Sequence, residues 1–143
     1  MVEKMLVDPL VLADDIVSRS RITGITISGG EPFLQAGMLA LTLNRVKSLR
    51  PELNVLAFTG YHFEDLVWEQ ARDLLSHLDL LIDGEYIDSL NTGVGLRGSS
   101  NQRFIFLTDR LEPFRDQFEN GVRSFEMSVT DDGIFTIGIP KHY

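Results

Sequence analysis

Three apolar, β-branched runs, each followed by glycine or polar residues, constrain the fold of this chain more than any other feature. They are Gly24 to Ser28, Asn54 to Phe58 and Leu78 to Ile82. Segments with helical spacing, Gln35 to Leu49 and Phe63 to Leu75, separate them. Continuous apolar strands between helices are typical of a parallel sheet that is buried on both faces. The sequence therefore predicts an α/β fold with a mostly parallel sheet.

The ends of the chain add further elements. Asp8-Pro9 predicts a helix start, because it combines an N-cap with a proline at the first helical position. Arg103 to Leu107 is expected to be a strand, although its apolar run also fits a short buried helix. Ser124 to Thr130 and Ile134 to Ile139 flank Asp131-Asp132-Gly133. Asp-Gly between alternating segments predicts a C-terminal β-hairpin.

Composition excludes several classes of protein. With 43% hydrophobic and 24% charged residues, the 143-residue chain is expected to form one folded domain over residues 1–143. A net charge of −8 without a basic cluster argues against nucleic acid as a partner. The apolar runs are too short to cross a membrane, and the first residues do not form a signal peptide, so a cytoplasmic location is expected. The sequence contains no cysteine, which excludes disulfides and thiolate metal sites.

The segment Ser28-Gly29-Gly30-Glu31-Pro32 directly follows the first predicted strand. Glycines let the main chain approach a ligand, Glu31 adds a charged acceptor, and Pro32 ends the strand. Polar or glycine-rich segments also follow the next two strands, at Thr59-Gly60-Tyr61 and Asp83-Gly84-Glu85. Such strand ends carry the reactive residues in a barrel of βα units, which favours a ligand site, although turn residues at strand ends are common without one.

These segments resemble, in order, four blocks of the glycyl-radical-enzyme activases, which are radical S-adenosylmethionine (SAM) enzymes. The blocks are Ile25 to Gln35, Ala57 to Tyr61, Leu80 to Tyr86 and Leu96 to Arg103. The chain looks most like an anaerobic ribonucleotide reductase activating protein, with the pyruvate formate-lyase activases beside it. The resemblance implies an incomplete (β/α) barrel of the radical SAM type. It also implies reductive cleavage of SAM to a 5′-deoxyadenosyl radical, which takes a hydrogen atom from a glycine of a partner enzyme.

The resemblance implies two sets of site residues. The set expected to contact SAM is Ser28, Gly29, Gly30, Glu31, Pro32, Thr59 and Asp83. The set expected to line the mouth and meet the glycine loop of the partner is Ser99, Ser100, Asn101, Gln102 and Arg103. Alternatives stay open for each: a turn cap for Thr59, a salt bridge to Arg97 or Arg103 for Asp83, and capping of the next element for the serines.

The family binds a [4Fe–4S] cluster through Cys-x3-Cys-x2-Cys, between its first strand and its first helix. This chain begins at that helix and has no cysteine. We therefore expect a truncated domain that lacks the first strand and cluster loop and is redox-inert as it stands. Ligation by the scattered His62, His77 or His142 is not expected. An in-frame Cys-x3-Cys-x2-Cys motif upstream of Met1 would favour a shortened enzyme, and a stop codon would favour a natural homologue without a cluster.

Other interpretations of the sequence remain. A cluster-less homologue could still bind a partner protein or a ligand. A carboxylate-dependent hydrolase using Glu31, Asp83 and Glu85 ranks last, because no nucleophile or base accompanies them. An unpaired edge on the Gly24 to Ser28 strand would favour a homodimer. Gly93 to Gly98 has the G-x-G-x-x-G spelling but lacks the preceding strand and following helix of a dinucleotide site, so we expect a loop there.

Overall fold

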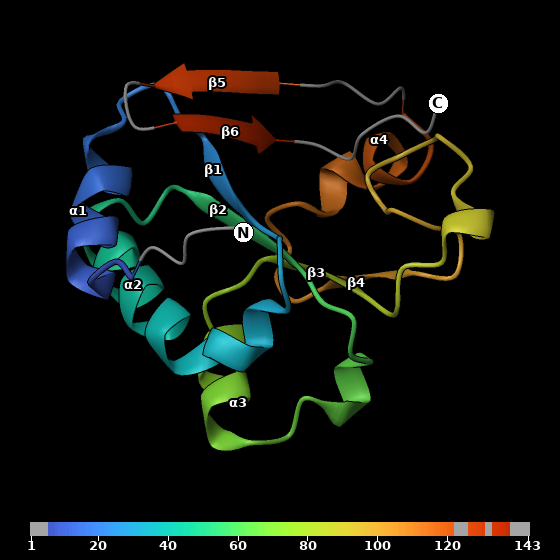
Figure 1. Cartoon of the computed structure of the whole chain (residues 1–143), viewed down its shortest axis with the longest axis horizontal. Helices are drawn as coiled ribbons and strands as arrows, with labels where there is room; N and C mark the ends of the chain where they lie inside the picture. The colour runs from blue at the N-terminus through green and yellow to red at the C-terminus, as the bar shows by residue number, and fades with distance from the viewer. Residues whose placement is uncertain (1–5, 122–125, 131–132, 138–143) are drawn as a thin grey trace.

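The computed structural model describes residues 6–121, 126–130 and 133–137. At its centre lies a four-stranded sheet in the order β1-β2-β3-β4 (Figure 1). The strands are β1 Gly24–Ile27, β2 Asn54–Phe58, β3 Leu80–Asp83 and β4 Arg103–Phe106. The first three are parallel, and β4 pairs antiparallel with β3. The predicted α/β class and mostly parallel sheet are confirmed, and this sheet is open, since its described strands do not close on themselves.

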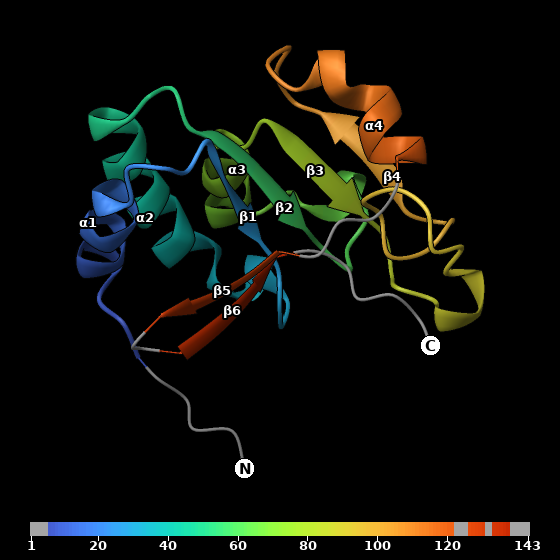
Figure 2. The same cartoon turned by 90° about the horizontal axis from the view of Figure 1, so that it is seen from above.

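Helices cover both faces of the sheet (Figure 2). The α-helices are α1 Pro9–Ser18, α2 Ala36–Leu49, α3 Glu69–Leu75 and α4 Arg115–Asn120. Four short 3-10 helices are η1 Pro32–Gln35, η2 Phe63–Asp65, η3 Asp88–Leu90 and η4 Glu112–Phe114. The first three α-helices lie on one face, and α4 with the segment before it covers the other. The crossovers through α2 and α3 therefore return on the same side of the sheet.

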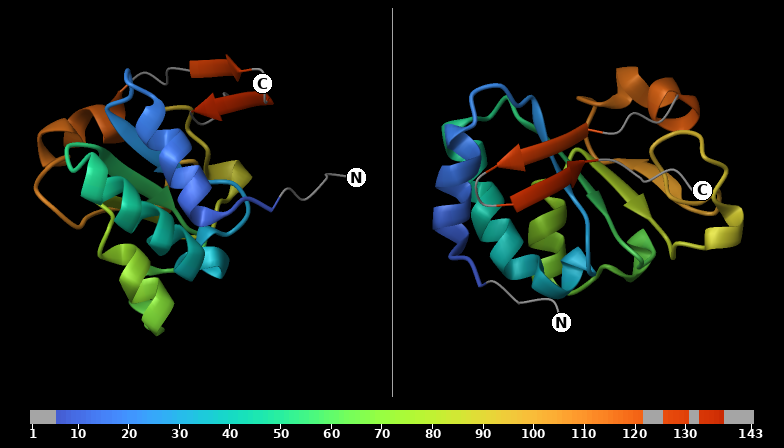
Figure 3. Two further views of the ribbon diagram at one scale, coloured as in Figure 1. Left: turned by 90° about the vertical axis from the view of Figure 1, so that its left-hand side faces the viewer. Right: turned by 45° about the horizontal axis from the view of Figure 1, so that its top comes forward.

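Helix α1 begins where the sequence predicts. The Asp8 carboxylate accepts hydrogen bonds from the backbone N–H groups of Leu10 (2.8 Å) and Val11 (3.2 Å), which satisfies two otherwise unpaired donors of the first turn. The helix runs alongside α2 (Figure 3, left). The Thr42 hydroxyl donates to the carbonyl of Pro9 (3.0 Å), and α1 thereby packs against α2.

Side chains of the central strands alternate between two apolar clusters. Val55, Ala57 and Leu81 pack against α2 and α3, whereas Leu56, Leu80 and Ile82 face the α4 side. The expectation that the first strand is buried on both faces is wrong. In β1, Ile25 and Ile27 pack on the helical side and Thr26 is exposed, because β1 is the edge strand and the apolar cluster on the α4 side comprises residues of β2, β3, β4 and the segment 96–118.

The predicted single helix from Phe63 to Leu75 is also wrong. The segment forms η2, an irregular stretch at 66–68 and then α3. Two tertiary contacts fix this break: the Phe63 N–H donates to the Asp83 carboxylate (2.7 Å), and the ring of Trp68 lies edge-on to Tyr61 at 5.6 Å. Trp68 itself is extended (φ −79°, ψ 158°), so tertiary contacts override the helical spacing of the sequence.

Two further strands form a separate sheet. β5 Glu126–Thr130 and β6 Gly133–Ile137 pair antiparallel, with Thr130 opposite Gly133, and Asp131-Asp132 between them lies outside the described residues. For Arg103 to Leu107, the structure shows the predicted strand, one residue shorter, and not a helix. Within the described ranges, no helix has both the length and the apolar character needed to cross a bilayer.

Candidate functional site

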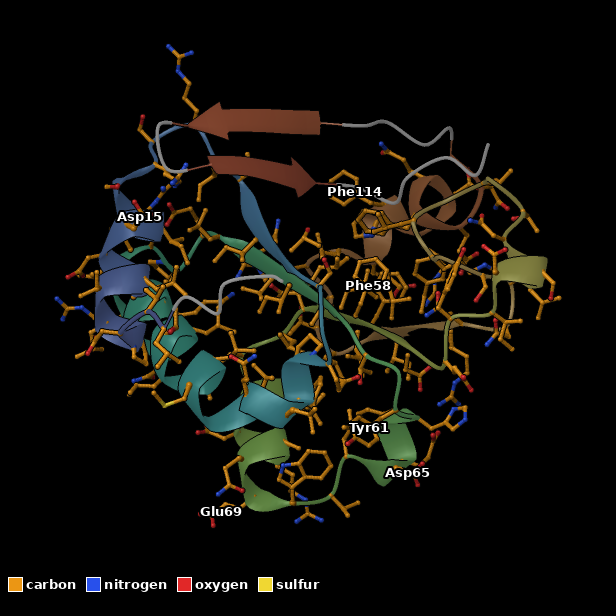
Figure 4. The ribbon with its side chains drawn as sticks, viewed as in Figure 1. Asp15, Phe58, Tyr61, Asp65, Glu69 and Phe114 are labelled. Atoms are coloured by element: carbon orange, nitrogen blue, oxygen red, sulfur yellow. The ribbon has the colours of Figure 1, made fainter. Side chains whose placement is uncertain are left out.

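The polar strand ends meet at one edge of the sheet, which we call the rim. It comprises residues 28–31 after β1, 59–61 after β2 and 83–84 at the end of β3. Asp83 pairs in register with Arg103, so the amino end of the antiparallel β4 joins the same edge. Figure 4 shows Tyr61 and Asp65 in the loop after β2, while Asp15 lies on α1. The predicted SAM-contacting residues thus lie along one edge of the fold.

Gly29 and Gly30 form the open part of the rim. Gly29 has a φ of 110°, which residues with a side chain rarely adopt. A Cβ added to either glycine would meet no atom within 4 Å. Ser28 and both glycines are exposed. The main chain here is therefore accessible to a ligand.

Glu31 links the loops that follow β1 and β2. Its Oε1 accepts hydrogen bonds from the Thr59 hydroxyl (2.8 Å) and the Gly60 N–H (2.6 Å), and its Oε2 accepts from the Phe33 N–H (2.9 Å). Thr59 is buried, and its hydroxyl also accepts from the Tyr61 N–H (3.1 Å). Within residues 6–121, no lysine or arginine forms an ion pair with Glu31. The half-buried carboxylate thus has no basic counter-ion in the part of the chain whose side chains the structure describes.

Asp83 is wholly buried at the end of β3 and receives its hydrogen bonds from the protein. Arg103 donates to both carboxylate oxygens, with Nε 3.0 Å from Oδ1 and Nη2 directed at Oδ2. The Phe63 N–H donates to Oδ2 as well. Of the alternatives raised by the sequence, the structure shows the salt bridge to Arg103. Glu85, the third carboxylate of the hydrolase interpretation, is exposed.

Glu64 lies in η2 beside the rim, and no sequence pattern points to it. Its Oε1 and Oε2 accept from Nη1 (3.1 Å) and Nη2 (2.7 Å) of Arg103. The hydrogen bonds from Arg103 lower the pKa of Glu64 to about 2. The hydrogen bonds to Asp83 and Glu64 in turn raise the pKa of Arg103 above its usual range. The two carboxylates share one guanidinium.

Side chains of residues 99–102 form hydrogen bonds within the long loop that follows β3. The Ser99 hydroxyl accepts from the Ile87 N–H (3.1 Å) and donates to Asn101 (2.6 Å). Gln102 donates to the Gly84 carbonyl (2.8 Å) and accepts from the N–H groups of Gly98 (2.8 Å) and Ser99 (3.1 Å). Ser100 and Asn101 are exposed. The hydroxyl and amide groups of this set thus hold the loop together, and the exposed pair faces solvent.

The G-x-G-x-x-G segment forms a loop, as predicted. Close packing explains two of its three glycines: a Cβ on Gly95 would lie 2.6 Å or less from the carbonyls of Phe118 and Glu119, and one on Gly98 would lie 2.7 Å from the Tyr86 ring. Gly93 has open space around it but a φ of 73°, which residues with a side chain rarely adopt. The element that follows Gly98 is the strand β4 and not a helix, so the segment lacks the helix N-terminus that binds a dinucleotide pyrophosphate.

The residues of this chain do not fit an iron–sulfur cluster. Such clusters are held by cysteine thiolates, and the 143-residue sequence has none. In the part of the chain that the structure describes, no three His, Cys, Asp or Glu side chains are grouped so that they could hold a metal ion. The rim can therefore offer hydrogen bonds and a carboxylate to a ligand, without thiolate ligation of a metal.

Comparison with known proteins identifies the family. The family model described as a 4Fe-4S single cluster domain matches residues 8–105. Three anaerobic ribonucleoside-triphosphate reductase-activating proteins are similar to the chain. The relative from Enterobacteria phage T4 is 36% identical over 95 residues (65% of this chain, 59% of the relative). The relative from Vibrio cholerae is 34% identical over 95 residues (64% and 61%), and that from Haemophilus influenzae is 33% identical over 105 residues (64% and 67%).

The chain spans about three fifths of the length of the phage and Vibrio relatives. No solved structure matches it significantly. The matched region contains α1, β1 to β3, the connecting helices and most of β4, and so includes the rim. The chain therefore belongs to the 4Fe-4S single cluster domain family and, within it, to the glycyl-radical-enzyme activases that its sequence blocks resemble.

Proposed function

We propose that this chain is the SAM-binding part of an activating protein for a glycyl radical enzyme, and that the partner is an anaerobic ribonucleotide reductase. The names of the curated relatives support this partner, because each states that the relative activates such a reductase. A pyruvate formate-lyase is the second candidate partner, by resemblance of the sequence blocks alone.

The observation that carries the proposal is the Glu31 carboxylate held beside an open diglycine. SAM has an α-ammonium group and a sulfonium, and both are attracted to an uncompensated negative charge. The exposed main chain of Ser28, Gly29 and Gly30 would bind the polar end of its methionine moiety. Pro32 is buried and starts η1, which keeps Glu31 in place. Bound SAM would supply an adenosyl group joined to a reactive sulfonium.

These 143 residues offer no thiolate to a cluster, so we propose that the chain alone is redox-inert. Anaerobic reconstitution with iron and sulfide should leave the purified chain free of stoichiometric iron and of cluster absorbance. Stoichiometric iron that survives gel filtration would contradict this. The proposed contribution of the chain is to bind SAM and to orient it toward a partner.

Substitution of Gly30 tests the SAM site. Gly30→Ala places a methyl group in the open space of the rim at a position whose φ is not restricted to glycine. We expect calorimetry to show one SAM site in the wild type and an affinity about tenfold lower in the variant, which corresponds to about 1.4 kcal/mol. Gly37→Ala, on the exposed surface of α2, is the matched control and should bind as the wild type does. Equal binding by all three proteins would refute the site.

The alternative function is that of a cluster-less binding module that docks a partner without chemistry. The absence of cysteine favours it. A pull-down with an anaerobic ribonucleotide reductase separates the two: binding that SAM strengthens supports the activase part, and binding with no SAM site supports the module. In either case we place the protein in the cytoplasm.

The order of the strands also suggests how the sheet relates to a larger barrel. A parallel sheet in sequential order with its crossover helices on one face is the arrangement of a (β/α) barrel, so we propose that β1 to β3 form an arc of a radical SAM barrel followed by a C-terminal hairpin. Within the described strands, β1 pairs only with β2 and has a free edge. A homodimer through that edge is proposed, and light scattering that gives only monomer would remove it.

A further inference from the structure

We propose that Arg103 is a positioning residue of the rim. It clamps the loop of residues 59–66 against the end of β3, and that loop in turn holds the Glu31 carboxylate. Arg103 acts through Asp83 and Glu64. The ligand part of this inference rests on the proposed SAM site, whereas the clamping of the loop is measurable without a ligand.

The guanidinium of Arg103 lies between two carboxylates and donates to both in a forked manner. On one side Nε and Nη2 meet the two oxygens of Asp83. On the other side Nη1 and Nη2 meet the two oxygens of Glu64, at 3.1 and 2.7 Å. Such planar, two-pronged pairing is specific to arginine, since the lysine ammonium acts as a point charge. Arg103 thereby joins β4, β3 and η2.

Two contacts pass this constraint to the loop after β2. The Asp83 carboxylate, while bound to Arg103, accepts the Phe63 N–H at 2.7 Å. The Gly84 N–H, next in the chain, donates to the Tyr61 carbonyl at 2.9 Å. Residues 61 and 63 are therefore held at the end of β3. The loop that they belong to carries the Thr59 hydroxyl and the Gly60 N–H, which both donate to Glu31 Oε1.

Burial makes Asp83 dependent on this partner. Asp83 is 0% exposed, and a buried charge without its counter-ion is unfavourable, so loss of the guanidinium forces the carboxylate to rearrange. Arg103 is 47% exposed at its side chain and lies outside the apolar clusters, so its loss should loosen the rim without opening the core. The expected effect is local.

Arg103→Gln and Arg103→Lys test the inference, with Arg115→Gln as the matched control. Arg115 is similarly exposed and also pairs with two carboxylates, Glu112 and Glu119, but it packs on Phe106 at the opposite end of β4. The measurements are amide hydrogen exchange and SAM affinity. We expect exchange at Gly60 and Phe63 to accelerate in both Arg103 variants, while Val55 and Leu81 in the core strands keep their protection. SAM affinity should fall about fivefold to tenfold, the size of a typical coupling between sites, and lysine should not rescue it.

The outcomes are distinct. Uniform acceleration of all amides would mean that Arg103 only stabilises the fold, and it would overturn the inference. Unchanged SAM affinity in Arg103→Gln, with binding in the wild type, would overturn it too. If the wild type binds no SAM, the proposed function fails, and selective exchange at Gly60 and Phe63 then decides the positioning role alone. If Arg103→Gln does not fold, Glu64→Gln, which keeps the Asp83 pair, should give the same pattern at a smaller amplitude, and no selective change at Gly60 or Phe63 in that variant would overturn the inference.

Discussion

Asp79 directly precedes β3 and Asp83 is its last residue; both are buried, but they have different hydrogen-bond partners. Asp79 accepts from the Val55 N–H (2.8 Å) and the Thr108 hydroxyl (2.8 Å), and Lys47 lies 3.4 Å away. These contacts tie β3 to β2, to the residues after β4 and to α2. Asp83 instead pairs with a half-exposed arginine that it shares with Glu64. We call the amino end of the sheet locked, because Asp79 connects β3 to other parts of the core. At the carboxyl end, Asp83 is instead connected to surface loops through Arg103, and we call this end coupled.

The comparison shows why one end is suited to a ligand. At the Asp79 end, the buried carboxylate binds groups from β2, α2 and the residues after β4. At the Asp83 end, the glycines after β1 leave open space, and the carboxylates arrange loops that a ligand can reach. Binding residues often lie on loops that a rigid framework holds in position. Here the strands are the framework, and the loops at their ends carry the groups that a ligand can reach.

Breaking the locked end should have the largest effect on stability. Asp79→Ala leaves the Val55 N–H and the Lys47 ammonium without their buried acceptor, so we expect a loss of about 3 kcal/mol in the free energy of unfolding. Urea denaturation measures it. Asp73→Ala, at an exposed position on α3, is the control and should change stability by no more than about 0.5 kcal/mol. A loss below about 1 kcal/mol in Asp79→Ala would show that this end is not locked.

The coupled end should respond differently, even to a more conservative substitution. Asp83→Asn keeps the shape but presents an amide group to donors from Arg103 and Phe63, so we expect a loss of about 2 kcal/mol. Unlike Asp79→Ala, it should also weaken SAM binding about tenfold, because the loop after β2 loses its anchor. Calorimetry measures the SAM affinity of both variants. If both weaken SAM binding to the same degree, the two ends do not differ in function.

The smallest expected effect is a pH dependence. The pKa of Glu64 is lowered from 4.5 to about 2 by Arg103, so the pair stabilises the fold above about pH 4.5 and loses its contribution as the pH falls toward 2. The stability difference between wild type and Glu64→Gln should therefore be constant above about pH 4.5 and shrink below it. Urea denaturation across this range checks the sign. A difference that persists unchanged at about pH 3 would show that the pair does not titrate in this way.

The framework of this fold is predictable where periodicity and burial agree. Asn54 to Phe58 was delimited correctly because its apolar run lies in the middle of the sheet and is bounded by turn residues. The helix predicted over Phe63 to Leu75 failed because its break depends on Asp83 and Tyr61, which lie outside its own periodic pattern. Helix α4 has no clear signal in the sequence, since Phe118 is the only apolar residue in 115–120 and most of the segment is exposed.

The candidate site divides in the same way. Gly29, Gly30 and Glu31 are recognisable because their order after a strand is specific. The acceptor role of Glu31 toward Thr59 and Gly60 depends on two loops meeting in space, which local sequence does not encode. The role of Glu64 cannot be recognised from the sequence, because a single acidic residue in a polar loop is usually just exposed to solvent. Only the structure shows that Arg103 lies beside it.

We propose above all that the rim binds SAM at Gly29 and Gly30. A titration of the ¹⁵N-labelled chain with SAM, followed by amide chemical shifts, tests it most directly. We expect saturable shifts concentrated at Gly29, Gly30 and Gly60, with little change at Val55 and Leu107 near the opposite edge. Absence of saturable shifts, or shifts centred away from the rim, would contradict it.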